Sequence, residues 1–302
     1  MAEATDKKEK PEELLDPQFL KRLEVLQLTT RRVFAGRMRG ERRSHRRGTS
    51  IDFADYRNYV RGDDTRFIDW NIYGRLDKLF LKLFIEELDL YFYILIDTSK
   101  SMGFGEPSKM LYAKQLAAAL GYIGLSNMDK IGMVAFDEQE RNFLSPTRGK
   151  SQVWKLLRFL NELEADGQTS LYNICRSFVL RRPVKGIVVL ISDLLDGDGY
   201  EEALKWFLRG NYEVYVLHIL APEEIDPTVR GHLELVDAET DWGVEVSVTD
   251  PLLRIYKRTV EAFCGGVKRY CTQYGMNYVL ARTSTPFDRL ILDVLRRRGL
   301  LR

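Results

Sequence analysis

The sequence is poor in the features that mark secreted or membrane-spanning proteins. Its three cysteines, Cys175, Cys264 and Cys271, cannot all pair and form no C-x-x-C motif, a pattern typical of buried thiols in a reducing compartment. Residues 1–16 are mostly charged and lack the apolar stretch of a signal peptide, so we expect them to be a disordered tail. No apolar run approaches the roughly 20 residues of a membrane span. These absences predict a cytoplasmic protein.

The sequence also lacks an excess of charge of one sign. Its 46 basic and 44 acidic residues leave a net charge of +2, so any attraction to nucleic acid or membrane would need a local patch. Residues 31–47 are the candidate patch, with eight arginines. Phe34 is their only aromatic residue, whereas binders of single strands use several as stacking platforms. We favour a solvated or partner-facing segment, with nucleic-acid binding as the alternative.

Catalytic motifs are scarce as well. The only histidines are His45, His218 and His232, and none has a setting that suggests a base for a serine nucleophile. The chain has no G-x-x-x-x-G-K-[ST] loop for nucleotide phosphates. We therefore predict that the protein is not an enzyme. The alternative is a metal-dependent hydrolase or phosphatase with Asp97 as nucleophile.

Strand-like and helix-like segments alternate along most of the chain. Continuous apolar runs, typical of buried parallel strands, occur at 90–97, 130–137, 186–193 and 212–220, followed by a shorter one at 277–281. Helical periodicity lies between and after them, at 108–127, 150–163, 170–181, 200–209, 250–274 and 286–298. This alternation predicts an α/β fold with a doubly wound, mostly parallel sheet and helices on both faces.

Two further features complete the predicted organisation. Residues 141–145 form a possible edge strand, and a hairpin insertion is expected at about 231–248, around the turn Thr240-Asp241-Trp242-Gly243. Upstream, we expect an amphipathic helix over 17–34 and an N-terminal extension over 17–85 that packs against the main domain. The main α/β domain is predicted to cover 86–302.

A group of oxygen-bearing residues predicts a metal site. Asp97, Ser99 and Ser101 form a D-x-S-x-S motif directly after an apolar strand, Thr169 precedes a predicted helix, and Asp193 ends another apolar strand. In open parallel sheets, ligands bind beyond the carboxyl ends of the strands, at the topological switch point. Hard oxygen ligands suit Mg²⁺, with Mn²⁺ or Ca²⁺ as alternatives. The competing interpretation is a polar turn with Ser99 or Ser101 capping a helix.

This constellation resembles the metal-ion-dependent adhesion site of von Willebrand factor A domains. The resemblance implies a von Willebrand A-like fold and metal ligation by Asp97, Ser99, Ser101 and Thr169, with Asp193 often acting through water. It also implies that a partner docks an acidic residue on the metal.

The upstream segment resembles the hallmark of the bacterial domain-of-unknown-function-58 family. There too the hallmark precedes a strand and an Asp-x-Ser-x-Ser-Met motif, which Met102 completes here. This second resemblance implies partnership with a MoxR-type AAA+ ATPase in a chaperone-like assembly or maturation role. The hallmark residues are Phe53, Tyr56, Arg57, Tyr59, Gly62, Asp63, Asp64, Arg66, Ile68, Asp69, Trp70 and Arg75.

Two acidic groups have competing interpretations. Asp63, Asp64 and Asp69 could form a catalytic cluster, but a network of ion pairs and turns is favoured because Arg57, Arg61, Arg66 and Arg75 stand nearby in the sequence. Asp193, Asp196 and Asp198 are spaced as in the start of a calcium loop but lack its twelve-residue length and closing glutamate, which favours a solvated acidic loop.

The predicted function is a non-enzymatic, Mg²⁺-dependent protein-interaction module.

Overall fold

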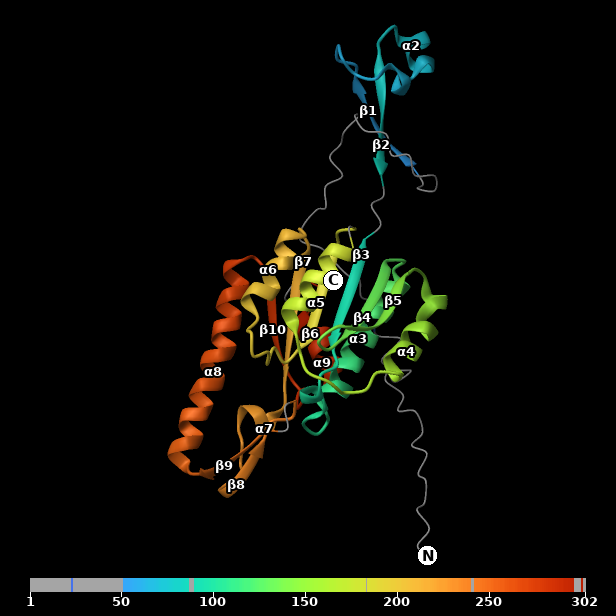
Figure 1. The fold of residues 1–302 in the computed structure, drawn as a ribbon. Coiled ribbons are helices and arrows are strands. Elements are labelled where there is room, and N and C mark those ends of the chain that lie inside the picture. Colours follow the sequence, from blue (N-terminus) through green and yellow to red (C-terminus); the bar gives the residue numbers. More distant parts are fainter. Residues whose placement is uncertain are drawn as a thin grey trace, which may run out of the picture. The chain divides into compact units, whose positions relative to one another are not determined.

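A six-stranded sheet forms the centre of the larger of two units in the computed structural model (Figure 1). The strand order is β10-β7-β6-β3-β4-β5, and only β5 runs antiparallel to its neighbour. The predicted mostly parallel sheet is confirmed, as is the edge strand. The strands are β3 (Tyr91–Asp97), β4 (Lys130–Phe136), β5 (Glu140–Thr147), β6 (Ile187–Ser192), β7 (Glu213–Leu220) and β10 (Asn277–Arg282).

The described residues are 23, 51–86, 90–182, 184–239, 242–295 and 300. They divide into the larger unit, which takes in 1–31 and 90–302, and a smaller unit over 32–89. The tail at 1–16 and the arginine-rich segment at 31–47 therefore lie outside the described residues. So does the helix expected over 17–34, apart from Leu23, which is helical and buried.

Helices cover both faces of the sheet, as predicted. Phe92, Ile94 and Ile96 of β3 pack into the core on one face, and Tyr93 and Leu95 into the core on the other. Because both faces are buried, β3 is a continuous apolar run instead of an alternating one. The first core contains α3 (Lys109–Ser126), α4 (Val153–Asn161) and a π-helical turn (Leu290–Leu295); the second contains α5 (Leu171–Arg181), α6 (Glu201–Arg209) and α8 (Asp250–Gln273).

The C-terminal helix differs from its prediction. Periodicity predicts one helix over 286–298, but the structure has the short α9 (Phe287–Arg289) followed directly by the π-helical turn. Leu290 and Ile291 at the start of that turn are buried in the core. Their packing against the sheet is a tertiary contact, which helical periodicity does not register.

The predicted hairpin is confirmed. It consists of β8 (Gly231–Val236) and β9 (Gly243–Val248), which pair antiparallel as a separate two-stranded sheet. Thr240 and Asp241 of the predicted turn lie outside the described residues. The short α7 (Pro222–Ile225), which the sequence did not predict, lies between β7 and the hairpin.

The smaller unit is a hairpin with two short helical turns between its strands. Strands β1 (Ile51–Asn58) and β2 (Phe80–Glu86) pair antiparallel, and the connection contains a 3-10 helix (Thr65–Phe67) and α2 (Trp70–Leu76). This connection carries the three aspartates that sequence analysis singled out.

The aspartates of the smaller unit have mainly structural partners. Arg57 donates two hydrogen bonds to Asp63, at 2.7 and 2.8 Å, and Arg66 pairs with Asp64. Asp69 instead caps α2, where its Oδ1 accepts the backbone N–H groups of residues 71 and 72. In the described part of the chain, Arg61 and Arg75 form no ion pair with these three residues. The structural network is thus present in part, and it organises the connection between β1 and β2.

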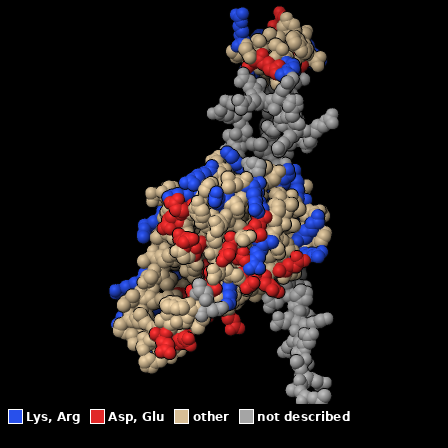
Figure 2. All heavy atoms as spheres, in the orientation of Figure 1, with Lys and Arg blue, Asp and Glu red and all other residues tan. Residues whose placement is uncertain are grey.

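Neither a membrane-spanning helix nor a patch of one charge on the face shown in Figure 2 is found among the described residues. Of the helices in the described ranges, none combines the length and the apolar character that crossing a membrane requires. Figure 2 shows basic and acidic side chains interspersed over that face of the larger unit. This distribution agrees with the nearly balanced composition.

Candidate metal centre

Two buried aspartates lie at the point where the sheet reverses its winding. From β3 the chain adds β4 on one side and later places β6 on the other, so β3 and β6 are neighbours at the centre. Asp97 is the last residue of β3, and Asp193 directly follows β6. Both side chains are 0% exposed. This is the edge at which open α/β sheets bind ligands.

The D-x-S-x-S segment folds its hydroxyls toward these carboxylates. The Ser99 N–H donates to Asp97 Oδ1 at 2.9 Å, which turns the chain at the strand end. Ser99 Oγ lies 3.1 Å from Ser101 Oγ, and Ser101 Oγ donates to Asp193 Oδ2 at 2.8 Å. Ser99 precedes a 3-10 helix (Lys100–Gly103), but its side chain makes no capping hydrogen bond. The contacts of both serine hydroxyls therefore do not support the helix-cap interpretation.

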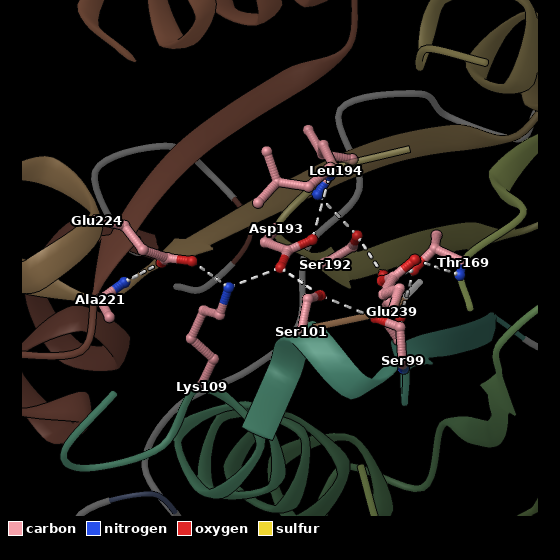
Figure 3. A network of polar contacts seen from close by, with 12 residues as sticks. Ser99, Ser101, Lys109, Thr169, Ser192, Asp193, Leu194, Ala221, Glu224 and Glu239 are labelled. Carbon is pink, nitrogen blue, oxygen red and sulfur yellow. Dashed lines mark hydrogen bonds and ion pairs between the residues drawn. The ribbon is translucent and has the colours of Figure 1, made fainter. Parts of the chain in front are cut away.

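Thr169 completes the predicted group from a third segment. Its Oγ1 lies 3.5 Å from Asp97 Oδ1. The loop before α5 is held against the D-x-S-x-S segment by two backbone hydrogen bonds, Lys100 N to Gly167 O at 2.9 Å and Asp166 N to Thr98 O at 2.8 Å. All five predicted residues thus lie in one polar network, most of which Figure 3 shows.

The donor set fits a hard divalent cation. Neighbouring ligands in an octahedral Mg²⁺ shell lie about 3 Å apart, given metal–oxygen distances near 2.0–2.1 Å. The contacts from Ser99 to Ser101, from Ser101 to Asp193 and from Thr169 to Asp97 span 2.8–3.5 Å. Among the described residues, no group of three or more His, Cys, Asp and Glu side chains could hold a metal ion. A metal at this site would therefore depend on the hydroxyl oxygens.

A buried lysine beside the site was not predicted. Lys109, at the start of α3, is 0% exposed, and its Nζ lies 2.6 Å from Asp193 Oδ2 and 2.5 Å from Glu224 Oε1 (Figure 3). Glu224 belongs to α7 and also accepts the Ala221 N–H at 2.7 Å. In the sequence, Lys109 opens a predicted helix and Glu224 lies in an acidic stretch. Neither position signals burial, because only the fold brings them to Asp193.

The electrostatics of the network favour a cation. Burial, followed by repulsion from Asp193, raises the pKa of Asp97 to about 7. Burial also raises the pKa of Glu224, although Lys109 opposes this shift. For Lys109, burial lowers the pKa, but attraction to Asp193 and Glu224 outweighs it and the net pKa is raised. Asp193 and Glu224 thus share one ammonium group, and Asp97 is buried close to Asp193, in a poorly hydrated region where uncompensated charge is costly.

Comparison with known proteins places the chain in a family. The sequence matches the family described as "Protein of unknown function DUF58" over residues 55–262. The chain belongs to this family. Similar proteins include the uncharacterized proteins Mb1516 of Mycobacterium bovis and Rv1480 of Mycobacterium tuberculosis, each 25% identical over 294 residues, covering 95% of this chain and 92% of the relative.

Solved structures show a weaker likeness. An aerotolerance-related membrane protein from Bacteroides fragilis matches with a TM-score of 0.43 and 17% identity, over 69% of this chain and 99% of that one.

The DUF58 match includes all five candidate metal ligands and most of the upstream hallmark. The resemblance to this family seen in the sequence is therefore confirmed.

In this DUF58 protein, the neighbouring Asp196 has structural partners. Asp196 Oδ2 accepts the Leu171 N–H at the start of α5 at 2.7 Å, and Asp196 Oδ1 accepts the Asp198 N–H at 2.8 Å. Asp196 therefore satisfies an N-terminal donor of α5. The predicted alternatives were a solvated acidic loop and a calcium loop; the contacts of Asp196 are those of a helix cap.

The histidine of β7 is also held structurally. His218 is 0% exposed, its Nδ1 lies 2.9 Å from Tyr278 Oη, and burial lowers its pKa to about 4. Burial therefore favours the neutral imidazole, and the tyrosine hydroxyl holds its Nδ1.

Ser192 is a further site residue that sequence analysis missed. It is 0% exposed; its Oγ donates to Asp97 Oδ2 at 2.6 Å and accepts the Leu194 N–H at 2.9 Å. The available signal was its position, one residue before the strand-end Asp193. Leu194, which follows, has a φ of 58°, a conformation that is strained for a branched side chain and typical of functional sites.

Ser192→Ala is expected to lower the free energy of unfolding by about 1–3 kcal/mol, because it leaves a buried carboxylate oxygen and a buried N–H without this partner. Urea denaturation in EDTA measures the effect without a contribution from metal. Ser177→Ala is the control, since Ser177 Oγ bonds only a carbonyl of its own helix. Equal stability of the Ser192 variant and the wild type would contradict a structural role for this hydroxyl.

Proposed function

We propose that the larger unit is a von Willebrand factor A-like domain that binds a partner protein through Mg²⁺ and catalyses no reaction. The observation that carries the proposal is the convergence of hydroxyl and carboxylate oxygens from three segments at the switch point between β3 and β6. These segments are separated by 72 and 92 residues in the chain. Such a set of hard oxygens suits Mg²⁺, and Mn²⁺ or Ca²⁺ would be accepted by the same ligands.

Each residue has a proposed role. Asp97, Ser99, Ser101 and Thr169 would hold the ion, with Asp193 assisting directly or through water. When bound, the ion supplies an electrophilic position that an incoming carboxylate can occupy. A site with few charged ligands rewards an additional anion more than one that already has four carboxylates. The partner would therefore dock an Asp or Glu side chain.

The partner class follows from the family resemblance. We propose that the protein is an adaptor for a MoxR-type AAA+ ATPase in chaperone-like assembly or maturation, acting in the cytoplasm. The absence of catalysis is part of the proposal, because the hydroxyls near Asp97 contact carboxylates and each other, and His218 Nδ1 is paired with the Tyr278 hydroxyl. Catalysis at such a site would need a general base within hydrogen-bond reach.

Mg²⁺ should stabilise the wild type, and Asp97→Ala should abolish that effect. At 100 times its dissociation constant, a ligand of the native state adds about 2.7 kcal/mol, or roughly 5–10 °C in Tm for a domain of this size. Thermal unfolding with and without Mg²⁺ measures the shift. Asp226→Ala, which removes an exposed aspartate of the same unit, should keep it. An unchanged shift in Asp97→Ala would place the metal elsewhere.

A further inference from the structure

The loop of the β8–β9 hairpin brings a carboxylate to the candidate metal centre. Glu239 accepts the Thr169 N–H at 3.1 Å through Oε2, and Thr169 Oγ1 lies 3.3 Å from Glu239 Oε1. Gln168 Nε2 donates to the Glu239 carbonyl at 3.2 Å. Three hydrogen bonds thus join the hairpin loop to the segment that presents Thr169. Figure 3 shows Glu239 beside Thr169 and Ser99.

The contact between Glu239 and Thr169 adds a second carboxylate to a hydroxyl that the central network already holds. Thr169 Oγ1 already faces Asp97 Oδ1 at 3.5 Å, so a single hydroxyl lies between a carboxylate of the sheet and one of the hairpin. The 3.3 Å separation from Glu239 Oε1 is close to the roughly 3 Å between neighbouring ligands in an octahedral shell. Glu239 therefore lies where one more ligand of a metal held by Thr169 would belong.

The hairpin is built so that this contact can be broken. It forms its own two-stranded sheet and pairs with no strand of the central sheet. Many of its side chains are exposed, including Leu235 and Val236. A two-stranded hairpin is only marginally stable by itself, so its loop can separate from Gln168 and Thr169 without disrupting the core. In Figure 1 it lies beyond the edge of the sheet where β3 ends.

Glu239 also differs from the five predicted ligands in kind. Those residues lie at strand ends and in loops of the central sheet, whereas Glu239 lies in the loop of the separate β8–β9 hairpin. Its backbone N–H donates to Asp237 Oδ1 at 2.9 Å, which fixes the start of the loop. A partner carboxylate approaching the metal would be of the same chemical class as the Glu239 side chain.

We propose that Glu239 is an additional metal ligand from within the chain, occupying the position that a partner's carboxylate must take. This inference rests on the proposed function, and it adds regulation to the same site. With the hairpin in place, Glu239 would fill the position that the other ligands leave open. Binding of a partner then requires its acidic residue to displace Glu239, so the hairpin sets a threshold for partner affinity.

Mn²⁺ is the probe for the test, because it accepts the same octahedral oxygen ligands and its bound water can be counted by proton relaxation. Glu239→Gln should weaken Mn²⁺ binding about tenfold, the order by which supporting groups change metal affinity. It should also raise the relaxivity of each bound ion, since one more exchanging water enters the shell. Electron paramagnetic resonance of free Mn²⁺ gives the affinity.

Glu234→Gln on β8 is the matched control, because it removes the same charge from the same hairpin at an exposed position. Its Mn²⁺ affinity and relaxivity should equal those of the wild type. Equal affinity and equal relaxivity of the wild type and Glu239→Gln would overturn the role of Glu239 while leaving the metal site intact. Failure of the wild type to bind Mn²⁺ would overturn the proposed metal-dependent function together with this inference.

Discussion

Lys109→Met is expected to lower the free energy of unfolding by about 3–5 kcal/mol, the usual cost of removing one partner from a buried ion pair. Lys109 is fully buried and its Nζ contacts both Asp193 and Glu224. Methionine fills a similar volume but offers no charge, so two carboxylates would face each other without an ammonium group between them. An unchanged free energy of unfolding would show that the network is hydrated enough to tolerate the loss of the ammonium group.

Urea denaturation at fixed pH in EDTA measures this effect, and a surface pair provides the control. Lys257 pairs with Asp226, but their side chains are 42% and 67% exposed. Exposed pairs contribute little because water and salt screen them, so Lys257→Met should change stability by less than about 1 kcal/mol. In the presence of Mg²⁺ the Lys109 variant should recover more stability than the wild type gains, since the cation becomes the main compensation for Asp193.

A complex with a AAA+ ATPase partner is expected to require Mg²⁺ and to weaken about 30-fold or more on chelation. Removing one member of a desolvated, charge-paired contact across an interface costs about 2–5 kcal/mol. Asp97→Ala should have the same effect as EDTA. Affinity is measured by surface plasmon resonance with the purified ATPase in Mg²⁺ and in EDTA.

Two milder variants distinguish an effect on the metal site from an effect on folding. Ser99→Ala and Thr169→Ala remove neutral oxygens from the candidate centre and should weaken the complex while the protein still unfolds cooperatively. A single acidic residue of the partner should be as necessary as Asp97. A complex that keeps full affinity in EDTA and with Asp97→Ala would move the docking surface elsewhere, with residues 51–75 the next candidate.

The sheet could be predicted from the sequence because its signals are local. Burial on both faces makes β3, β6 and β7 continuous apolar runs, and helical periodicity separates them. The edge strand β5 and the hairpin were likewise visible in alternation and turn residues. The C-terminal segment was predicted as one regular α-helix, whereas α9 is followed directly by a π-helical turn, because periodicity does not show that Leu290 and Ile291 pack into the core.

The five candidate ligands could be predicted because motif and topology coincide. Asp97, Ser99 and Ser101 stand together in the sequence, and Asp193 follows a strand of the same sheet. Parallel strands deliver their carboxyl ends to one edge, so two strand-end aspartates meet if their strands are neighbours. The strand order makes β3 and β6 neighbours. The metal itself and the partner remain proposals.

The sequence by itself determined the alternating strands and helices and the order of polar residues at their ends, since both depend on residues a few positions apart. Only the tertiary structure decided what surrounds the site. Lys109 meets Glu224 across 115 residues, and Thr169 meets Glu239 across 70. No local pattern reports such contacts, because they arise from strand order and from the path of α7 and the hairpin. The charge balance of the site and its proposed in-chain ligand follow from that arrangement.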